Sequence, residues 1–528
     1  MAQRLCLLLS AFLASTHALY AGQEAPPPAP QYLVVMAPAF RASLEPLCAQ
    51  RQADGMKVRV VAVSDVLSDD EIRAGDGKKL VEHVQKLCKD HEGPSYVVLA
   101  GAVEGGGKVV VPALRGSISR MKDQPTDNAY GCLDGERLPT VAVGRLPART
   151  EEEMRAMVRK TLAFENDAKP GEWRQRLTVL AGVPAFNPLV DRMVEGMAMS
   201  RFAKLDPMWC VRAVYHNPGS RFCVPDERLN DLARTYVEKG QVMTVYLGHS
   251  WAGGLYAPKA RYLDRQDWAE LQIPTGAGVF TIFGCNGCQL SGAEGEGYGL
   301  AAMRNPQGPA AVTGSHGICF AAMCQLGADG VLSSVQGGKY PERLADVWLA
   351  LKAGIANGKM DALTFKMLDA VDGDSKIPQA VQRQEHLEMF MLLGDPALRM
   401  PRIAEKVQLT TEGDLTPGAV LNVSGEVSEK LQGGRVRLTL ERPLTSEPAD
   451  LEALPPGTAA DRSQIVLANH ERANRFVLRV VELPIQEGRF AGEVRVPETL
   501  PWPRLLLRAY ATTGRHEALG VLPLEVKK

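Results

Sequence analysis

The stretch Gly278–Leu290 reads GVFTIFGCNGCQL. Its first half is rich in β-branched and aromatic residues and stops at a glycine, which predicts a buried β-strand that enters a tight turn. Cys285 stands directly after the strand, and Cys288 follows three residues later. Three roles fit such a cysteine: a catalytic thiol, one half of a redox or metal-binding pair with Cys288, or a cystine in the turn.

A second apolar run ends in a similar way. Residues Val242–His249 read VMTVYLGH, and Ser250 follows. In an open parallel sheet, ligands bind beyond the carboxyl ends of the strands, so if these two strands are neighbours, His249 and Cys285 meet in one crevice. A thiol beside an imidazole forms a nucleophile with its base, and the flanking glycines allow turns that aim backbone N–H groups at an oxyanion. This combination favours a catalytic thiol.

Strands and helices alternate on both sides of these two runs. Before residue 169, the predicted strands are Gln31–Pro38, Lys57–Val63, Ser95–Ala102 and Thr140–Pro147, and the predicted helices are Phe40–Ala53, Lys78–Lys89 and Glu151–Glu165. After it, further strands are predicted at Arg176–Val183 and Pro309–Ser315, and helices at Pro188–Phe202, Asp226–Glu238, Arg343–Ile355 and Gln379–Leu392. This alternation predicts two α/β units with mostly parallel sheets, residues 32–168 and 169–403.

The pattern of apolar and polar residues changes after Gly394–Pro401. Seven short alternating runs follow, separated by turn residues. Such a series is typical of a β-sandwich, and we assign residues 404–528 to it. The expected fold class is therefore α/β, with two α/β subdomains followed by an all-β sandwich.

The N-terminus has the layout of a secretory signal peptide. Arg4 precedes the apolar run Leu5–Ala14, and small residues follow it. We therefore expect residues 1–21 to be a signal peptide and residues 22–31, which contain EAPPPAP, to be a Pro-rich spacer. A buried first helix is the alternative interpretation.

The composition of the chain limits which binding partners and which cellular location we expect. The 528 residues carry a formal net charge of −1, and no block of like charge occurs, so neither nucleic acid nor an anionic membrane surface is indicated as a partner. No later stretch reaches the roughly 18 uninterrupted apolar residues of a membrane span. We expect a secreted, periplasmic or cell-surface protein, whose oligomeric state the sequence leaves open.

The order of these motifs resembles the gingipain-like cysteine peptidases, family C25 of the caspase-like clan. In that family one apolar strand leads to Gly-His and another to a Cys commonly followed by Asn-Gly, as YLGHS and FGCNG do here. Three further segments match in order: Thr126–Thr150, which looks like an Asp-x-x-Tyr segment and a Val-Gly-Arg strand, Gly308–Ser315, which looks like a strand lining the specificity pocket, and Leu393–Pro401, which contains Gly-Asp-Pro-x-Leu. The resemblance covers roughly Tyr32–Lys528.

The resemblance implies two caspase-like α/β subdomains, an immunoglobulin-like sandwich and the activity of a secreted cysteine endopeptidase on protein or peptide substrates. His249 corresponds to the catalytic histidine and Cys285 to the nucleophile, which would form an acyl-enzyme thioester. The backbone N–H groups of Ser250 and Cys285, beside Gly248, stand where the oxyanion hole is expected.

The resemblance also indicates a specificity pocket near Ser315 and Phe320, with Arg or Lys expected before the cut. Asp127 and Asp329 are candidates for its acidic group. The expected chemistry requires no cofactor and no metal, although the resemblance makes a structural calcium ion possible.

Two positions differ from the family pattern. Ser250 stands where the family usually has glycine, and Thr140 begins a strand that usually begins with an acidic residue. The alternative function is therefore a catalytically inactive peptidase homologue that acts as an exported binding or adhesion protein.

The cysteines keep a second alternative open. Nine follow the predicted signal peptide, so at least one thiol is unpaired in any disulfide scheme. Cys285 and Cys288 have redox or zinc spacing, and His316, Cys319 and Cys324 could add ligands, but no second Cys-x-x-Cys exists. We expect Cys288 to be a buried thiol or to form a disulfide with Cys319 or Cys324.

Overall fold

The computed structural model describes residues 28–527 apart from residues 105–107, 168, 183–187, 258–259, 275, 292–294, 373–375 and 455–458. The predicted signal peptide and most of the predicted spacer lie outside the described residues. Within these ranges, none of the helices combines the length and the hydropathy of a membrane span.

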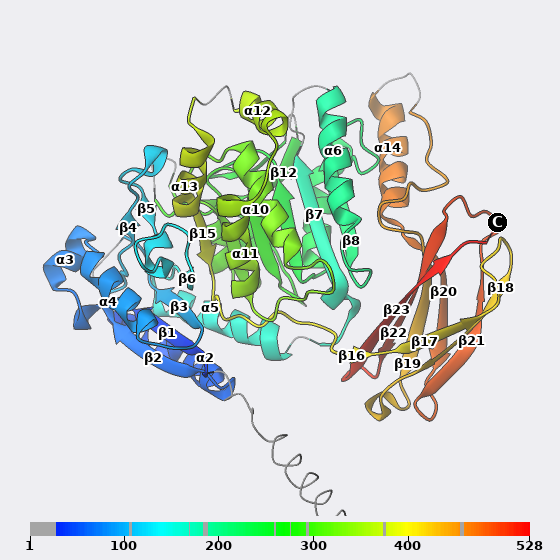
Figure 1. Cartoon of the computed structure of the whole chain (residues 1–528), viewed down its shortest axis with the longest axis horizontal. Helices are drawn as coiled ribbons and strands as arrows, with labels where there is room; N and C mark the ends of the chain where they lie inside the picture. Colours follow the sequence, from blue (N-terminus) through cyan, green and yellow to red (C-terminus); the bar gives the residue numbers. More distant parts are fainter. Residues whose placement is uncertain are drawn as a thin grey trace, which may run out of the picture.

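One ten-stranded sheet runs through the α/β part, in the order β2-β1-β3-β6-β15-β14-β13-β9-β7-β8 (Figure 1). Neighbouring strands are parallel except β15 and β14, which are antiparallel, so the sheet consists of two parallel halves that run in opposite directions. The bounds are β1 Gln31–Met36, β2 Lys57–Ala62, β3 Ser95–Ala100, β6 Ala142–Leu146, β7 Arg176–Gly182, β8 Cys210–His216, β9 Met243–Leu247, β13 Val279–Phe283, β14 Ala311–Ser315 and β15 Phe390–Leu393.

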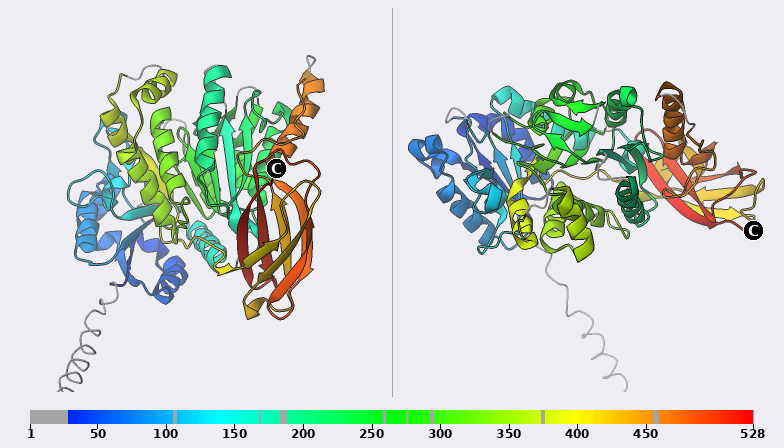
Figure 2. Two further views of the ribbon diagram at one scale, coloured as in Figure 1. Left: turned by 45° about the vertical axis from the view of Figure 1, so that its right-hand side comes forward. Right: turned by 90° about the horizontal axis from the view of Figure 1, so that it is seen from above.

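Helices cover both faces of this sheet (Figure 2). They are α2 Arg41–Ala53, α3 Asp69–Ala74, α4 Lys78–Lys89, α5 Glu151–Leu162, α6 Pro188–Phe202, α7 Leu229–Glu238, α8 Arg265–Glu270, α9 Tyr298–Arg304, α10 Ala321–Ser333, α11 Leu344–Asn357, α12 Ala362–Val371 and α13 Gln379–Met389. The short strands are β4 Leu114–Arg115, β5 Pro125–Thr126, β10 Ser250–Trp251, β11 Gly254–Ala257 and β12 Ala260–Asp264. Because helices cover both faces, β13 is buried along its whole length, and its sequence VFTIF is apolar apart from one threonine.

One predicted helix is wrong at its C-terminal end. The prediction was Gln379–Leu392, but α13 ends at Met389, and Phe390–Leu393 form β15. A short apolar run fits either a strand or a buried helix, and periodicity cannot separate them. Here β15 pairs with β6 on one side and β14 on the other, so it joins the two predicted α/β units in one sheet.

The C-terminal part is rich in β-structure, and each of the seven predicted runs forms a strand. The order is β16-β23-β22-β19-β20 in one sheet and β17-β18-β21 in another, and side chains from both sheets share one hydrophobic core. The bounds are β16 Glu405–Lys406, β17 Gln408–Glu412, β18 Val420–Glu426, β19 Arg435–Glu441, β20 Val477–Pro484, β21 Arg489–Arg495, β22 Arg504–Thr512 and β23 Glu517–Glu525. Helix α14, Ala459–Asn474, was not predicted and contacts β8.

Buried polar contacts hold the C-terminal part against the α/β part. Arg508 on β22 pairs with Glu441 and donates to the side-chain oxygen of Gln175 at 2.8 Å. On α14, the Nε2 atom of His470 is hydrogen-bonded to the Tyr236 hydroxyl at 2.9 Å. Because these groups are buried, each depends on its partner across the interface.

Candidate active site

The two strand ends that carry His249 and Cys285 lie next to each other. β9 and β13 are parallel neighbours, with Leu247 in register with Phe283. His249 and Cys285 each stand two residues beyond these paired positions, and both line one cavity. The structure therefore brings them together at the carboxyl ends of adjacent strands, where parallel sheets bind ligands.

A hydrogen bond ties the two turns together. The Ser250 hydroxyl donates to the carbonyl oxygen of Cys285 at 2.7 Å. Ser250 is buried, and it is not among the described residues with positive φ, so this position accepts a serine without backbone strain. After the cysteine, Asn286 adopts a left-handed φ of 58°, a conformation that asparagine tolerates better than most residues.

Two glycines make this approach of the turns possible. A Cβ atom on Gly284 would lie 2.4 Å from the Ser250 Oγ atom and 2.7 Å from the Gly248 carbonyl oxygen. Gly248 itself has a φ of 155°, and a Cβ there would meet the Tyr246 hydroxyl at 2.7 Å. Side chains at either position would push the histidine and cysteine turns apart.

The Cys285 thiol sits in a setting that keeps it protonated. Burial is the main reason that its pKa rises to about 12, and the neighbouring Cys319 thiol adds to the rise. The backbone N–H of Cys319 forms a hydrogen bond with the thiol and opposes this rise, as does the charge of Arg120. A nucleophile in this state needs a base to take its proton.

The imidazole of His249 is exposed, whereas its backbone is firmly held. Its carbonyl oxygen accepts hydrogen bonds from the Tyr246 hydroxyl at 2.6 Å and from the Tyr256 N–H at 2.9 Å. The ring lies edge-on to the Tyr256 ring, with centroids 6.5 Å apart. No hydrogen bond joins the side chains of His249 and Cys285, both of which the structure describes; such contacts commonly tighten only when substrate binds.

Ser315 and Phe320 lie around the cysteine turn. Ser315 is fully buried; its Oγ atom accepts the Asn286 N–H at 3.1 Å and lies 2.8 Å from the Gly284 carbonyl oxygen. The Arg120 guanidinium lies over the Phe320 ring, 3.9 Å from its centroid. Ser315 thus stabilises the turn, but neither Ser315 nor Phe320, both predicted near the specificity pocket, is among the residues that line the cavity with Cys285.

Asp127 lies elsewhere. Its carboxylate pairs with the buried Arg145 through two hydrogen bonds of 2.7 and 2.6 Å, and it is not part of the lining of the cavity that holds Cys285. Its charge is balanced by Arg145, so it does not supply that cavity with a free carboxylate. The positive charge that neutralises Asp127 comes from the Val-Gly-Arg strand, whose arginine the sequence analysis had not assigned a role.

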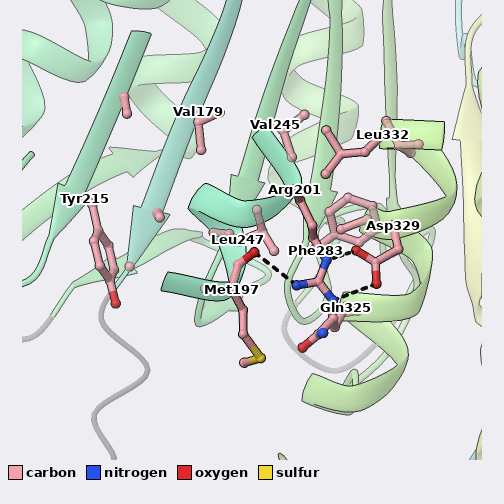
Figure 3. A pocket seen from close by; sticks show the side chains of 18 of the residues that line it. Val179, Met197, Arg201, Tyr215, Val245, Leu247, Phe283, Gln325, Asp329 and Leu332 are labelled. Carbon is pink, nitrogen blue, oxygen red and sulfur yellow. Dashed lines mark hydrogen bonds and ion pairs between the residues drawn. The ribbon is translucent and has the colours of Figure 1, made fainter. Parts of the chain in front are cut away.

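Acidic side chains also line the cavity that holds Cys285. Asp329 on α10 lines it, as expected for a pocket candidate, but forms an ion pair with Arg201 on α6 (Figure 3). Asp372 also lines it and was missed, because only the packing of the folded chain brings it to the cavity. Burial raises the pKa of Asp372 to about 6, although its carboxylate accepts the Ala321 N–H at 2.9 Å.

Cys288 is a buried free thiol, the first of its two predicted states, and it forms no disulfide. All nine cysteines after the predicted signal peptide are free thiols, including the buried Cys288, Cys319 and Cys324, so the proposed Cys288 bond is wrong. The Cys288 thiol fills a tightly packed position, because a Cβ atom on Gly299 or Gly314 would lie only 3.3 or 3.0 Å from its Sγ atom. Among the residues that the structure describes, no group of three or more His, Cys, Asp or Glu side chains is arranged to hold a metal ion.

Comparisons with known proteins agree on a family and a fold. The model of peptidase family C25 matches residues 25–401. Two solved structures resemble the chain over nearly its whole length. The complex of Porphyromonas gingivalis RgpB pro- and mature domains has 15% sequence identity and a TM-score of 0.52, and the match covers 94% of this chain and 100% of that one. The Arg-specific cysteine proteinase gingipain R (RgpB) has 14% identity and a TM-score of 0.53, and the match covers 96% of this chain and 100% of that one. No curated protein matches the chain.

Proposed function

Because the chain belongs to peptidase family C25, and is therefore a cysteine-type peptidase, we propose that it is an endopeptidase with Cys285 as nucleophile and His249 as base. The observation that carries this proposal is the pairing of β9 with β13, which sets the two residues at adjacent strand ends on one cavity. Protein or peptide chains are its substrates.

The proposed reaction has two halves. The Sγ atom of Cys285 attacks the carbonyl carbon of the scissile bond while the thiol proton passes to His249, and the N–H groups of Ser250 and Cys285 stabilise the oxyanion. The C–N bond then breaks, His249 gives its proton to the leaving amine, and the acyl group stays on Cys285 as a thioester. Water attacks the thioester with His249 as base, which releases the new carboxyl terminus and restores the thiol.

The electrostatics of the site support a base that acts during the attack. Because burial raises the pKa of Cys285 to about 12, the resting form of the nucleophile is the thiol. Hydrogen bonds hold the backbone of His249, while its imidazole is exposed, so the ring has room to turn toward the Cys285 thiol when substrate binds. No metal or cofactor takes part in these steps; the structural calcium ion that the resemblance makes possible would act on stability, and a chelator that lowers the melting temperature would reveal it.

The position of Ser250 supports an active enzyme over an inactive scaffold. A serine in place of the usual glycine could have strained the turn, but Ser250 instead donates a hydrogen bond that links it to Cys285. Thr140 is exposed, and its N–H donates to the Gly131 carbonyl oxygen at 3.0 Å.

Export and domain organisation complete the proposal. We infer that residues 1–21 direct secretion to the periplasm, the cell surface or the medium, and that residues 32–168, 169–403 and 404–528 are the structural units. The two C-terminal sheets around one core support an immunoglobulin-like sandwich for the last unit.

Hydrolysis of a mixed, internally quenched peptide library tests the proposal. Cys285→Ala and His249→Ala should each lower turnover at least about a thousandfold, whereas Cys48→Ser, at a partly exposed thiol, and His516→Ala, at an exposed histidine, should leave it unchanged. Circular dichroism confirms that each variant is folded. Hydrolysis that survives Cys285→Ala would contradict the proposed nucleophile, and a wild type that binds peptides without cleaving any would favour the binding protein.

A further inference from the structure

The sheet face beside the catalytic turns is incompletely covered. β7 and β9 are inner strands, and inner strands of a parallel sheet are normally buried on both faces. Val179, Val245 and Leu247 occupy one face of these strands, yet each is partly exposed. They line a cavity of about 280 Å³ that residues of α6 and α10 also line (Figure 3).

This cavity is apolar and reaches the catalytic pair. His249 and Cys285 are among its lining residues, so it borders the position at which a substrate carbonyl would be attacked. Away from that pair, aliphatic and aromatic side chains dominate the lining, among them Leu177, Phe202, Met243, Phe283, Leu332 and Val335.

Three of the described residues that line the cavity are acidic: Asp329, which has an ion-pair partner, and Glu195 and Asp372, whose printed contacts are hydrogen bonds. Glu195 accepts the Ser220 hydroxyl at 2.8 Å. Asp329 is paired with Arg201, with 3.0 Å between the Nη2 and Oδ2 atoms. Asp372 accepts the Ala321 N–H at the start of α10 and lies in the field of Arg120. Burial raises the pKa of Glu195 and of Asp372, which weakens the charge that these two carboxyl groups offer a cation. An apolar side chain contacts the aliphatic and aromatic lining and has no charge whose hydration would be lost.

We propose that this cavity is the specificity pocket and that it receives a large apolar side chain, aromatic or branched aliphatic, from the residue immediately before the scissile bond. The inference rests on the proposed function, because the acyl carbon of that residue bonds to Cys285 and its side chain must enter space beside the thiol. The volume is ample, since an apolar cavity of about 150 Å³ accommodates benzene. This preference departs from the Arg or Lys preference that the family resemblance implied.

Cleavage-site profiling of the wild-type enzyme is the primary test. Matched peptides that carry Phe, Leu, Met, Ala, Arg or Lys before the cut are compared by kcat/KM. Peptides with Phe, Leu or Met should exceed those with Arg, Lys and Ala by at least about tenfold. Selective cleavage after Arg or Lys, or selection only by the residue after the cut, would overturn the inference and leave the proposed peptidase function intact; no Cys285-dependent cleavage of any peptide would instead reject the function itself.

A substitution that fills the cavity provides the second test. Val245→Phe projects a larger side chain into the cavity, so kcat/KM should fall about tenfold or more for the Phe peptide and by less than about twofold for the Ala peptide. The control is Thr244→Val, because successive strand residues point to opposite faces and the volume is conserved. Equal losses on both peptides with Val245→Phe, at an unchanged melting temperature, would contradict the assignment.

Discussion

At the residue scale, the closest packing in the candidate site is at Gly284. We predict that Gly284→Ala lowers kcat/KM at least about a hundredfold, because its Cβ would lie 2.4 Å from the Ser250 Oγ atom and 2.7 Å from a backbone oxygen, and displacement of a catalytic group by about 1 Å has effects of this size. Gly219→Ala is the matched control, since the nearest atom to a Cβ there is 3.6 Å away. Steady-state kinetics with one peptide substrate measures both, and full activity of Gly284→Ala would show that the two turns need not approach so closely.

Ser250 offers a milder change at the same place. Ser250→Ala removes the hydrogen bond to the Cys285 carbonyl, and because a neutral hydrogen bond contributes about 0.5–1.5 kcal/mol, kcat/KM should fall roughly two- to tenfold. Rescue by Ser250→Thr, which restores a hydroxyl, separates loss of the bond from loss of folding. A variant with alanine that is as active as wild type would mean that this bond does not position the nucleophile.

Some site residues were predictable from the sequence because their signal is local. Cys285 and His249 each follow an apolar strand and a glycine, and the pairing of the strands then places them together. The state of Asp127 was not predictable, because its partner Arg145 lies 18 residues away and meets it only in the folded sheet. Asp372 was missed for the same reason, since only packing brings it to the cavity.

At the element scale, the segment between β14 and α10 depends on a buried histidine. His386 on α13 is fully buried; its Nε2 atom accepts the Phe320 N–H at 2.9 Å, and its Nδ1–H donates to the Gln382 carbonyl at 2.7 Å. Burial lowers the pKa of His386 to about 3, so the folded protein holds it neutral. Protonation would remove the acceptor of the Phe320 N–H beside the cysteine turn.

This arrangement predicts acid sensitivity. Because the folded-state pKa of His386 lies below its ordinary value of 6.5, the stability it gives is complete above pH 6.5 and is lost as the pH falls toward 3. Between about pH 4 and 6 it should contribute about 1.4 kcal/mol of unfolding free energy per pH unit. Urea unfolding across this range should show a shallower slope for His386→Gln than for wild type, with His516→Ala as the exposed control; identical slopes would contradict the role.

Element types were largely predictable, and the exceptions share a cause. Residues 31–53 and 78–89 carry clear strand and helix patterns and fold accordingly. β15 was read as a continuation of α13 because four apolar residues fit both periods, and only its place between β6 and β14 makes it a strand.

At the scale of the whole molecule, a buried ion cluster holds distant segments together. Arg51 on α2 is fully buried and pairs with Glu165 beyond α5 at 2.8 Å and with Asp395 beyond β15 at 2.7 Å. Asp395 also accepts a hydrogen bond from the Tyr32 hydroxyl on β1 at 3.1 Å. The Gly-Asp-Pro motif recognised in the sequence therefore has a structural role, which links the end of the sheet to the N-terminal unit.

We predict that Arg51→Met destabilises the protein by about 3–5 kcal/mol, because it removes the counter-charge of the buried Asp395 and leaves Glu165 only the more distant Arg399, at 3.9 Å. The matched control is Arg155→Met, at an exposed ion pair with Glu151, which should cost no more than about 1 kcal/mol. Denaturant unfolding of both variants gives the comparison. Equal small effects would show that the cluster does not hold the units together.

Intact-mass labelling of the purified protein with peptidyl acyloxymethylketones that carry Phe, Leu, Arg or Lys next to the warhead, followed by peptide mapping, tests the Cys285–His249 site directly. We expect one adduct per chain, located on Cys285 and absent from Cys285→Ala and His249→Ala, with the Phe and Leu reagents reacting fastest. An adduct on another cysteine, or labelling that persists at full rate in His249→Ala, would contradict a Cys285–His249 peptidase site.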